Sequence, residues 1–208
     1  MTRFAAPSSS STAISNAGKT GLRWHLRAAT EELHAEADRI GAGYDLRSLR
    51  GYRDFLSAHA RALPGLEAAC DAAGLQRLLP DWPGRRRAGA LASDLARLGA
   101  AMPPTRPAAL PSGPAAMGAA YVLEGSRLGN AMLLRIARSA PALAEADAFS
   151  YLSHKPEGEG WPGFLRHLEE TLPDPADWGA AAEGARLAFT CFLTAMRREK
   201  TTEPMPHA

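Results

Sequence analysis

The pattern of apolar and polar positions along the chain follows helical spacing. Apolar residues recur three and four positions apart, and no useful length of chain alternates apolar and polar residues as a half-buried strand does. Nothing repeats internally. We therefore predict an all-α, single-domain protein with helices over residues 22–40, 49–62, 66–73, 88–98, 115–138, 161–172 and 175–199.

Glycine and proline mark the ends of these helices. The glycines at 41 and 43 end the first helix, and Pro64-Gly65 is expected to separate the second from the third. Residues 102–114 contain repeated prolines, which lack an amide donor, so this stretch is predicted to be a connector. The helix over 115–138 is expected to be continuous and to end before Pro141. Residues 154–160 are expected to form another loop.

Length and composition fit one domain with two tails. The chain has 208 residues, of which 46% are hydrophobic. We expect a disordered N-terminal tail at 1–18, a domain at 19–200 and a flexible C-terminal tail at 201–208. The first eighteen residues lack the apolar core of a secretory signal, and no run approaches the ~20 apolar residues that span a bilayer. The sequence predicts a cytoplasmic protein with no membrane partner.

The net charge gives no support to a nucleic-acid-binding protein, and the cysteine spacing gives none to a zinc site or a disulfide framework. The formal net charge is only +2, so bulk electrostatics do not favour nucleic acid as a partner. The triplet Arg85-Arg86-Arg87 is interpreted as a solvated helix start in preference to a phosphate clamp. Cys70 and Cys191 show no zinc-site or disulfide spacing, which indicates buried free thiols in a reducing compartment.

The first helix carries a candidate metal ligand. At 100° per residue, His34 lies about 80° from Leu26, on the shoulder of the apolar stripe, where it can reach inward. Arg27 lies on the same side, roughly 10 Å along the axis. Most lone histidines at such positions are satisfied surface or core residues. A neutral imidazole is nevertheless a good haem-iron ligand, and a guanidinium suits a haem propionate.

A second metal hypothesis rests on the same helix. Glu31 and His34 have the ExxH spacing that ferritin-like di-iron sites use, but such a site needs a second ExxH on another helix. None of His25, His59, His154 and His167 has a Glu three positions earlier. The di-iron hypothesis therefore ranks low.

Two glycines lie inside the longest predicted helix. Gly125 and Gly129 each cost about 1 kcal/mol relative to Ala. They lie four apart on one face, which Gly118, Val122, Met132 and Ile136 are expected to share. The missing side chains could let another helix approach, or let a flat macrocycle and a small iron-bound ligand press against the backbone. Glycines also permit a kink, and Ser126 is near enough to organise water.

Three segments together resemble haem oxygenases, particularly the bacterial biliverdin-producing branch found beside bacteriophytochromes or in iron acquisition. Residues 30–34 (TEELH) resemble that family's proximal-ligand helix, and residues 121–129 (YVLEGSRLG) resemble its distal helix. Residues 160–164 (GWPGF) resemble the start of a later helix. The likeness extends over most of residues 22–199. The resemblance implies the family's all-α fold, with haem between the first helix and the distal helix.

The resemblance also implies roles for individual residues and partners. His34 would bind the iron, Gly125 and Gly129 would border the oxygen site, and Ser126 would lie beside it. Arg27 and Arg166 match positions where relatives hold the propionates, and Tyr121 matches a position that lines the pocket. The implied partners are haem, O₂, an electron donor such as ferredoxin or a reductase, and a bacteriophytochrome as biliverdin acceptor.

Three positions depart from the pattern of many relatives. Ser126 stands where many members have Asp, although the bacteriophytochrome-associated branch also has Ser there. Glu31 replaces a basic residue just before the ligand, and Pro162 stands where some relatives carry Lys. The propionate contacts implied by the resemblance are therefore few.

Three classes of function stay open from the sequence. The leading one is an enzyme that opens haem with O₂ and external electrons, giving biliverdin, CO and ferrous iron. The second is a non-catalytic haem-binding carrier or sensor on the same fold. The third is a cofactor-free or non-haem relative, since fold does not fix function.

Overall fold

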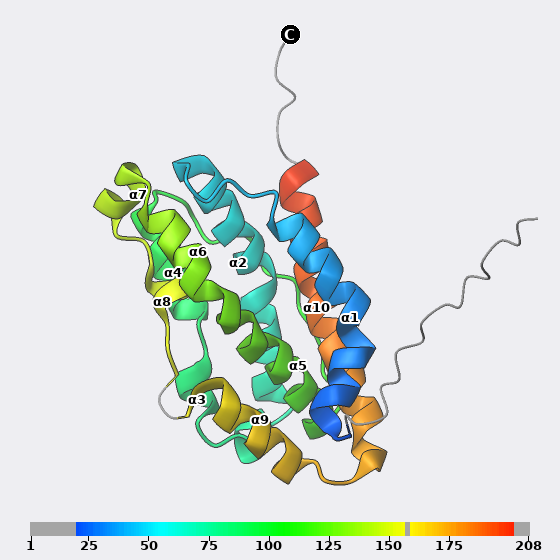
Figure 1. Ribbon diagram of the computed structural model, residues 1–208. Coiled ribbons are helices and arrows are strands. Elements are labelled where there is room, and N and C mark those ends of the chain that lie inside the picture. The colour runs from blue at the N-terminus through cyan, green and yellow to red at the C-terminus, as the bar shows by residue number, and fades with distance from the viewer. Residues whose placement is uncertain (1–19, 157–158, 202–208) are drawn as a thin grey trace, which may run out of the picture.

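The computed structural model describes residues 20–156 and 159–201, and within them all regular structure is helical (Figure 1). This confirms the all-α prediction. Apart from Thr201, the last residue of the last helix, both expected tails lie outside the described residues. The α-helices are α1 (Leu22–Gly41), α2 (Leu49–Ala72), α3 (Trp82–Arg85), α4 (Ala88–Arg97), α5 (Gly113–Gly125), α6 (Asn130–Arg138), α7 (Pro141–Ala146), α8 (Ser150–Ser153), α9 (Gly160–Thr171) and α10 (Trp178–Thr201). Short 3₁₀ helices are η1 (Leu75–Arg77), η2 (Ser126–Gly129) and η3 (Pro175–Asp177).

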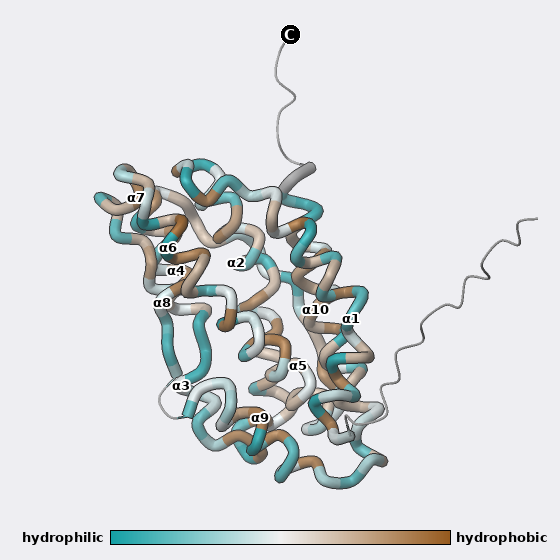
Figure 2. The backbone as a smooth tube through the Cα atoms, viewed as in Figure 1, coloured by the Kyte–Doolittle hydropathy of each residue, from teal (hydrophilic) through white to brown (hydrophobic). Residues whose placement is uncertain are grey.

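Helix α5 packs against α10, α2 and α9, and its residues 115–120 are all buried. Figure 2 shows hydrophilic and hydrophobic positions alternating along the helices around it. Helix α5 packs against α10 backbone to backbone. A Cβ added to Gly118 would lie 1.7 Å from the carbonyl oxygen of Ala181, and one added to Gly184 would lie 1.8 Å from that of Ala115. Only glycine fits at either position. The two helices are therefore held closer than any pair of larger residues would allow.

Helix α1 lies along α10 and touches α9 at its start (Figure 1). It has no side-chain cap of its own. The carboxylate of Glu169 on α9 accepts from the amides of Leu22 and Arg23, both at 2.9 Å. A carboxylate at the positive end of a helix is stabilising, so α9 both anchors and orients the start of α1.

The predicted break at Pro64-Gly65 is wrong, because α2 continues through both residues. A proline inside a helix costs about 3 kcal/mol, so other contacts must offset it. The connector crosses α2 at this point: the amide of Arg106 donates to the carbonyl of Arg61 at 3.3 Å. A Cβ on Gly65 would lie 2.1 Å from the Arg106 oxygen, so the glycine lets the connector approach. Leu63 and Leu66 are fully buried on either side.

The predicted helix over 115–138 is also not continuous. It consists of α5, the 3₁₀ segment η2 and α6. At the break the carbonyl of Leu123 accepts from two side chains, Ser126 Oγ at 2.7 Å and Arg87 Nη2 at 2.9 Å. Side chains that hydrogen-bond the backbone compete with regular helix, and glycines ease the change of path. After α6 the chain forms α7 from Pro141 onward, where no element was expected.

The contact between α5 and α10 predicts a sharp difference between two glycines of α10. Gly184→Ala should lower the free energy of unfolding by about 1–3 kcal/mol or more, because the new methyl group overlaps the Ala115 carbonyl. Gly179→Ala is the matched control, since a Cβ there meets nothing within 4 Å of the described chain, and should be neutral or slightly stabilising. Urea denaturation of the two variants measures both; equal stabilities would contradict the close helix contact.

Candidate functional site

An uncovered apolar surface surrounds Gly125 and Gly129. In the described residues, a Cβ on Gly129 would meet nothing within 4 Å, and one on Gly125 would meet only the indole ring of Trp161, at 3.4 Å. Leu128 and Met132 are 62% and 55% exposed, although large apolar side chains are normally buried. We call Gly125, Leu128, Gly129 and Met132 the kink surface. Packing against another helix does not explain these glycines.

Gly118 and Val122 do not belong to the kink surface, contrary to the sequence-based expectation. Gly118 faces Ala181 of α10, and Val122 is buried. The reason is geometric. The contact with α10 covers that face of α5, and the 3₁₀ turn η2 changes the angular register of the side chains after Gly125. Ile136, on α6, is half-buried against the core.

His34 lies on α1, and 64% of its side chain is exposed. Its position beside the apolar stripe had predicted a side chain that reaches further inward. Its Nδ1 is 3.1 Å from a carboxylate oxygen of Asp38, and its ring meets the ring of Phe189 edge-on at 5.7 Å. In the neutral ring, an Nδ1–H that donates to Asp38 leaves Nε2 as a free acceptor. Histidines that ligate metals have this arrangement, in which the carboxylate fixes the tautomer and the orientation of the ring. Sequence reasoning missed Asp38, although its i+4 spacing from His34 was visible.

A basic and aromatic group gathers between α1, α5 and α9. The guanidinium groups of Arg23 and Arg27 lie 4.5 and 5.9 Å from the ring centre of Trp24. The rings of Tyr121 and Trp161 are 5.4 Å apart. Burial raises the pKa of Tyr121, while the positive charges of Arg27 and Arg23 lower it, so both cations act electrostatically on its hydroxyl. The structure thus brings together Arg27 and Tyr121, and adds Arg23, whose i−4 spacing from Arg27 was the signal.

Arg166 stands apart from this group. It is exposed on α9 and forms an ion pair with Glu159, just before the same helix. No hydrogen bond or ring contact in the described residues links it to Tyr121 or Arg27. Its assignment to a propionate stays a prediction from the resemblance.

The expectation that residues 85–87 are a solvated helix start is wrong for two of the three. Arg85 and Arg87 are only 5% and 1% exposed, whereas Arg86 is exposed and pairs with Asp71. The short α3 ends at Arg85 and α4 begins after Arg87, so both side chains reach the end of α5. Arg85 Nη1 donates to Glu124 Oε2 at 2.8 Å. Buried charges need such partners, which a surface triplet would not have.

A third arginine completes this buried group. Arg127 Nε donates to Glu124 Oε1 at 2.9 Å, and its Nη1 lies 3.0 Å from Nδ1 of His154. Burial and the charges of Arg127 and Arg87 lower the pKa of His154, so its neutral ring accepts from Arg127. Arg85, Arg87, Arg127 and Glu124 therefore form an arginine cluster directly beneath η2. This arginine cluster supports the kink surface from the side that faces the protein core.

The structure gives no support to a di-iron site. No group of three or more His, Cys, Asp or Glu side chains in the described residues could hold a metal ion. The other histidines are engaged elsewhere: His25 lies against the ring of Trp178, and His167 Nε2 is 2.6 Å from the Leu78 carbonyl.

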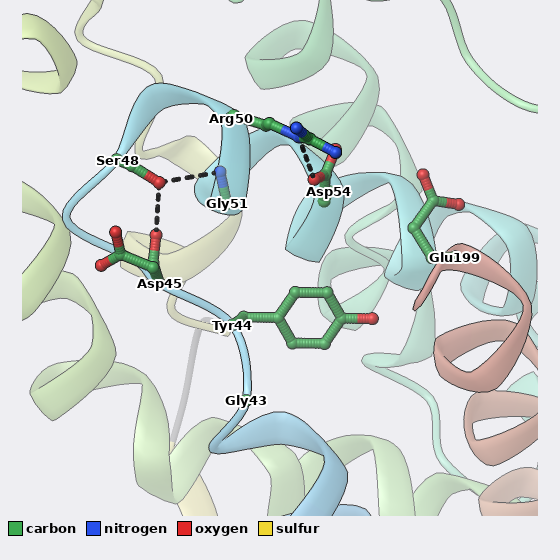
Figure 3. Close-up of a pocket in the computed structure, with 8 residues that line it drawn as sticks. All are labelled: Gly43, Tyr44, Asp45, Ser48, Arg50, Gly51, Asp54 and Glu199. Atoms are coloured by element: carbon green, nitrogen blue, oxygen red, sulfur yellow. Dashed lines mark hydrogen bonds and ion pairs between the residues drawn. The ribbon is translucent and has the colours of Figure 1, made fainter. Parts of the chain in front are cut away.

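A separate cavity of about 270 Å³ lies where the α1–α2 loop meets the end of α10, and Figure 3 shows its polar lining. It contains none of the predicted site residues. Its walls are Gly43, Tyr44, Asp45, Ser48, Arg50, Gly51, Asp54 and Glu199.

None of the described helices has the length and apolar character that crossing a membrane requires.

Comparison with known proteins decides the family. Residues 20–198 match the Heme oxygenase family. The chain belongs to the haem oxygenase family. A haem oxygenase of Xanthomonas campestris pv. campestris (strain 8004) is 33% identical over 149 residues, which cover 71% of this chain and 90% of that relative. The fold is shared with the haem oxygenase of Neisseria meningitidis, solved with NO and CO bound: the TM-score is 0.73, with 23% identity over 91% of this chain and 99% of that one. Family membership makes the chain an enzyme of haem degradation.

His59 of α2 has a fixed tautomer. Its Nδ1 lies 2.8 Å from the carbonyl of Phe55, so Nδ1 carries the proton. Its ring lies among those of Phe55, Tyr151 and Phe192. Burial lowers the pKa of His59 to about 4, and the charge of Arg87 adds to this effect. His59 is therefore neutral near pH 7.

This lowered pKa predicts a pH dependence of stability. The unfolded chain binds the His59 proton below about pH 6.5 and the folded chain only near pH 4, so stability is lost as pH falls through this window. Between pH 7 and pH 5 the wild type should lose about 2 kcal/mol more than His59→Gln. Denaturant unfolding of both proteins at the two pH values measures the difference. Equal losses would show that His59 is accessible to protons in the folded state.

Proposed function

We propose that haem binds between α1 and the kink surface, with His34 Nε2 as the iron ligand and Gly125 and Gly129 bordering the opposite side. The observation that carries this proposal is the bare backbone at Gly129 beside exposed Leu128 and Met132. Such a surface is costly in water and suits a flat apolar ring. α1 packs mainly on α10 and α9, and the proposal therefore places haem between α1 and the kink surface rather than between α1 and either of those helices.

The proposed reaction is the oxidative opening of haem to biliverdin, CO and ferrous iron, using O₂ and external electrons. Haem itself supplies the oxidation chemistry, and the protein holds the iron, limits access of bulk water and directs the bound oxygen. Family membership favours this enzyme over a haem carrier or sensor on the same fold.

The polar side chains have distinct proposed roles. Arg27 binds a propionate, because a guanidinium matches a carboxylate and this one is exposed beside α9. Tyr121 lines the same end, where its half-buried ring can contact the macrocycle. Arg166 can join them only by leaving Glu159. Ser126 modulates catalysis, because a hydroxyl cannot act as a carboxylate base near neutral pH.

The partners and the compartment follow from the proposed reaction. We propose an electron donor such as ferredoxin or a reductase, and a bacteriophytochrome as the biliverdin acceptor to test first. Cys70 and Cys191 are free thiols, which fits the reducing cytoplasm.

Replacement of His34 tests the iron ligand. His34→Ala should abolish the histidine-ligated haem spectrum and turnover while leaving helicity unchanged, because the side chain is largely exposed. His25→Ala is the matched control on the same helix and should keep both. Hemin titration followed by addition of a reductant reports the Soret band and then biliverdin. No Soret band in the wild type would reject haem binding, and a Soret band without ring opening would indicate a carrier.

Replacement of Gly129 tests the kink surface. Gly129→Leu should lower haem affinity or the rate of ring opening at least tenfold, about 1.4 kcal/mol or more, because the side chain fills the space that haem needs. The melting temperature of the apoprotein should not fall, since a Cβ there contacts nothing. Gly179→Leu, at an equally open glycine on α10, is the control and should leave haem binding unchanged. Normal turnover in Gly129→Leu would contradict a role at the haem face.

A further inference from the structure

The hydroxyl group of Ser126 has a defined orientation. Its Oγ lies 2.7 Å from the carbonyl oxygen of Leu123 and 2.8 Å from Nη2 of Arg87. A carbonyl only accepts and a guanidinium only donates, so the Ser126 proton points to Leu123 and Oγ accepts from Arg87. One lone pair of Oγ stays available, on a residue that is exposed beside the kink surface.

Arg87 is held rigidly enough to impose this orientation. It is 1% exposed, its amide donates to Glu67 at 2.6 Å, and its guanidinium lies 5.1 Å from the ring centre of Tyr151. The same Nη2 also donates to the Leu123 carbonyl at 2.9 Å. The serine hydroxyl, the carbonyl and the guanidinium therefore form a closed triangle at the start of η2.

The buried charge of Arg87 is unusual in the arginine cluster. Arg85 and Arg127 each form an ion pair with Glu124, whereas Arg87 forms no ion pair in the described part of the chain. Its Nη1 is buried and has no hydrogen-bond partner there. A buried cation with an unused donor is costly, and stability alone does not account for it.

We propose that Arg87 is a positioning residue of the distal side. It fixes Ser126 so that Oγ presents an acceptor, and no proton, to a water molecule above the kink surface. That water donates one proton to Oγ and has its second proton directed at a ligand on the haem iron. The inference rests on the proposed haem site and adds to it the origin of the distal hydrogen bond.

The chemistry of the triangle supports this role. Because Ser126 donates to Leu123, its remaining lone pair is a stronger acceptor than that of a free hydroxyl. A water molecule held by an acceptor must offer a proton on its other side, which is the polarity that an anionic or oxygen ligand needs. Without Arg87 the hydroxyl would be free to rotate and to donate its own proton instead.

Fluoride binding to the ferric haem complex tests the proposal, because fluoride accepts hydrogen bonds and cannot donate them. Ser126→Ala and Arg87→Met should each weaken fluoride binding about tenfold, the size expected for a lost hydrogen bond to a charged group. The double variant should be no weaker than either single variant, because both remove the same water contact. Arg86→Met is the control: it removes the neighbouring arginine, which is exposed, pairs with Asp71 and does not touch Ser126, and it should leave fluoride affinity unchanged.

Additive losses, or normal fluoride binding in Arg87→Met, would overturn the inference. If Arg87→Met does not fold, Arg87→Lys takes its place. An ammonium keeps the charge without the planar fork, so fluoride affinity should fall part of the way, and a wild-type value would also overturn the proposal. A wild type without a Soret band rejects the proposed function itself. Additive losses in a haem-binding, active protein reject only the role of Arg87.

Discussion

The backbone contact between α5 and α10 is the constraint on which the rest of the structure depends. Gly118 and Gly184 allow it, and each faces a carbonyl of the other helix. With α5 fixed in the core, its C-terminal end fixes the position of η2 and the kink surface. Because α1 packs along α10, the same contact also sets the position of His34. The positions of both sides of the proposed haem site, His34 on α1 and the kink surface after α5, therefore depend on the contact between α5 and α10.

At the end of α5 the apolar core gives way to charged groups. Glu124 is 2% exposed and accepts from two arginines, one on each of its oxygens. Buried ion pairs contribute little net stability, but they require specific geometry, because an unpaired partner would be heavily penalised. This requirement explains why η2 has a defined position although, in the described chain, a Cβ on its Gly129 would meet nothing within 4 Å. The cluster replaces packing as the means of holding the kink.

Much of the fold and the family were predictable from sequence, because helical periodicity is local and the His34 and Gly125 segments are distinctive when they occur together in this order and at this separation. The break at η2 was not predictable, since it depends on Arg87, which lies far earlier in the chain. The continuity of α2 through Pro64 likewise depends on a connector that crosses it. Arg85 and Arg87 look like surface residues until their partners at the end of α5 are known. Each error concerns a tertiary contact that overrides a local preference.

Helix α9 links the two sides of the proposed haem site. Its Glu169 caps the start of α1, while its Trp161 covers Gly125. Any displacement of α9 along its axis would therefore loosen the helix that bears His34 and uncover the distal glycine in the same movement. Entry of a large planar substrate and departure of an opened product both need more room than the bound state. A single rigid helix in contact with both walls makes the widening of the two sides concerted rather than independent.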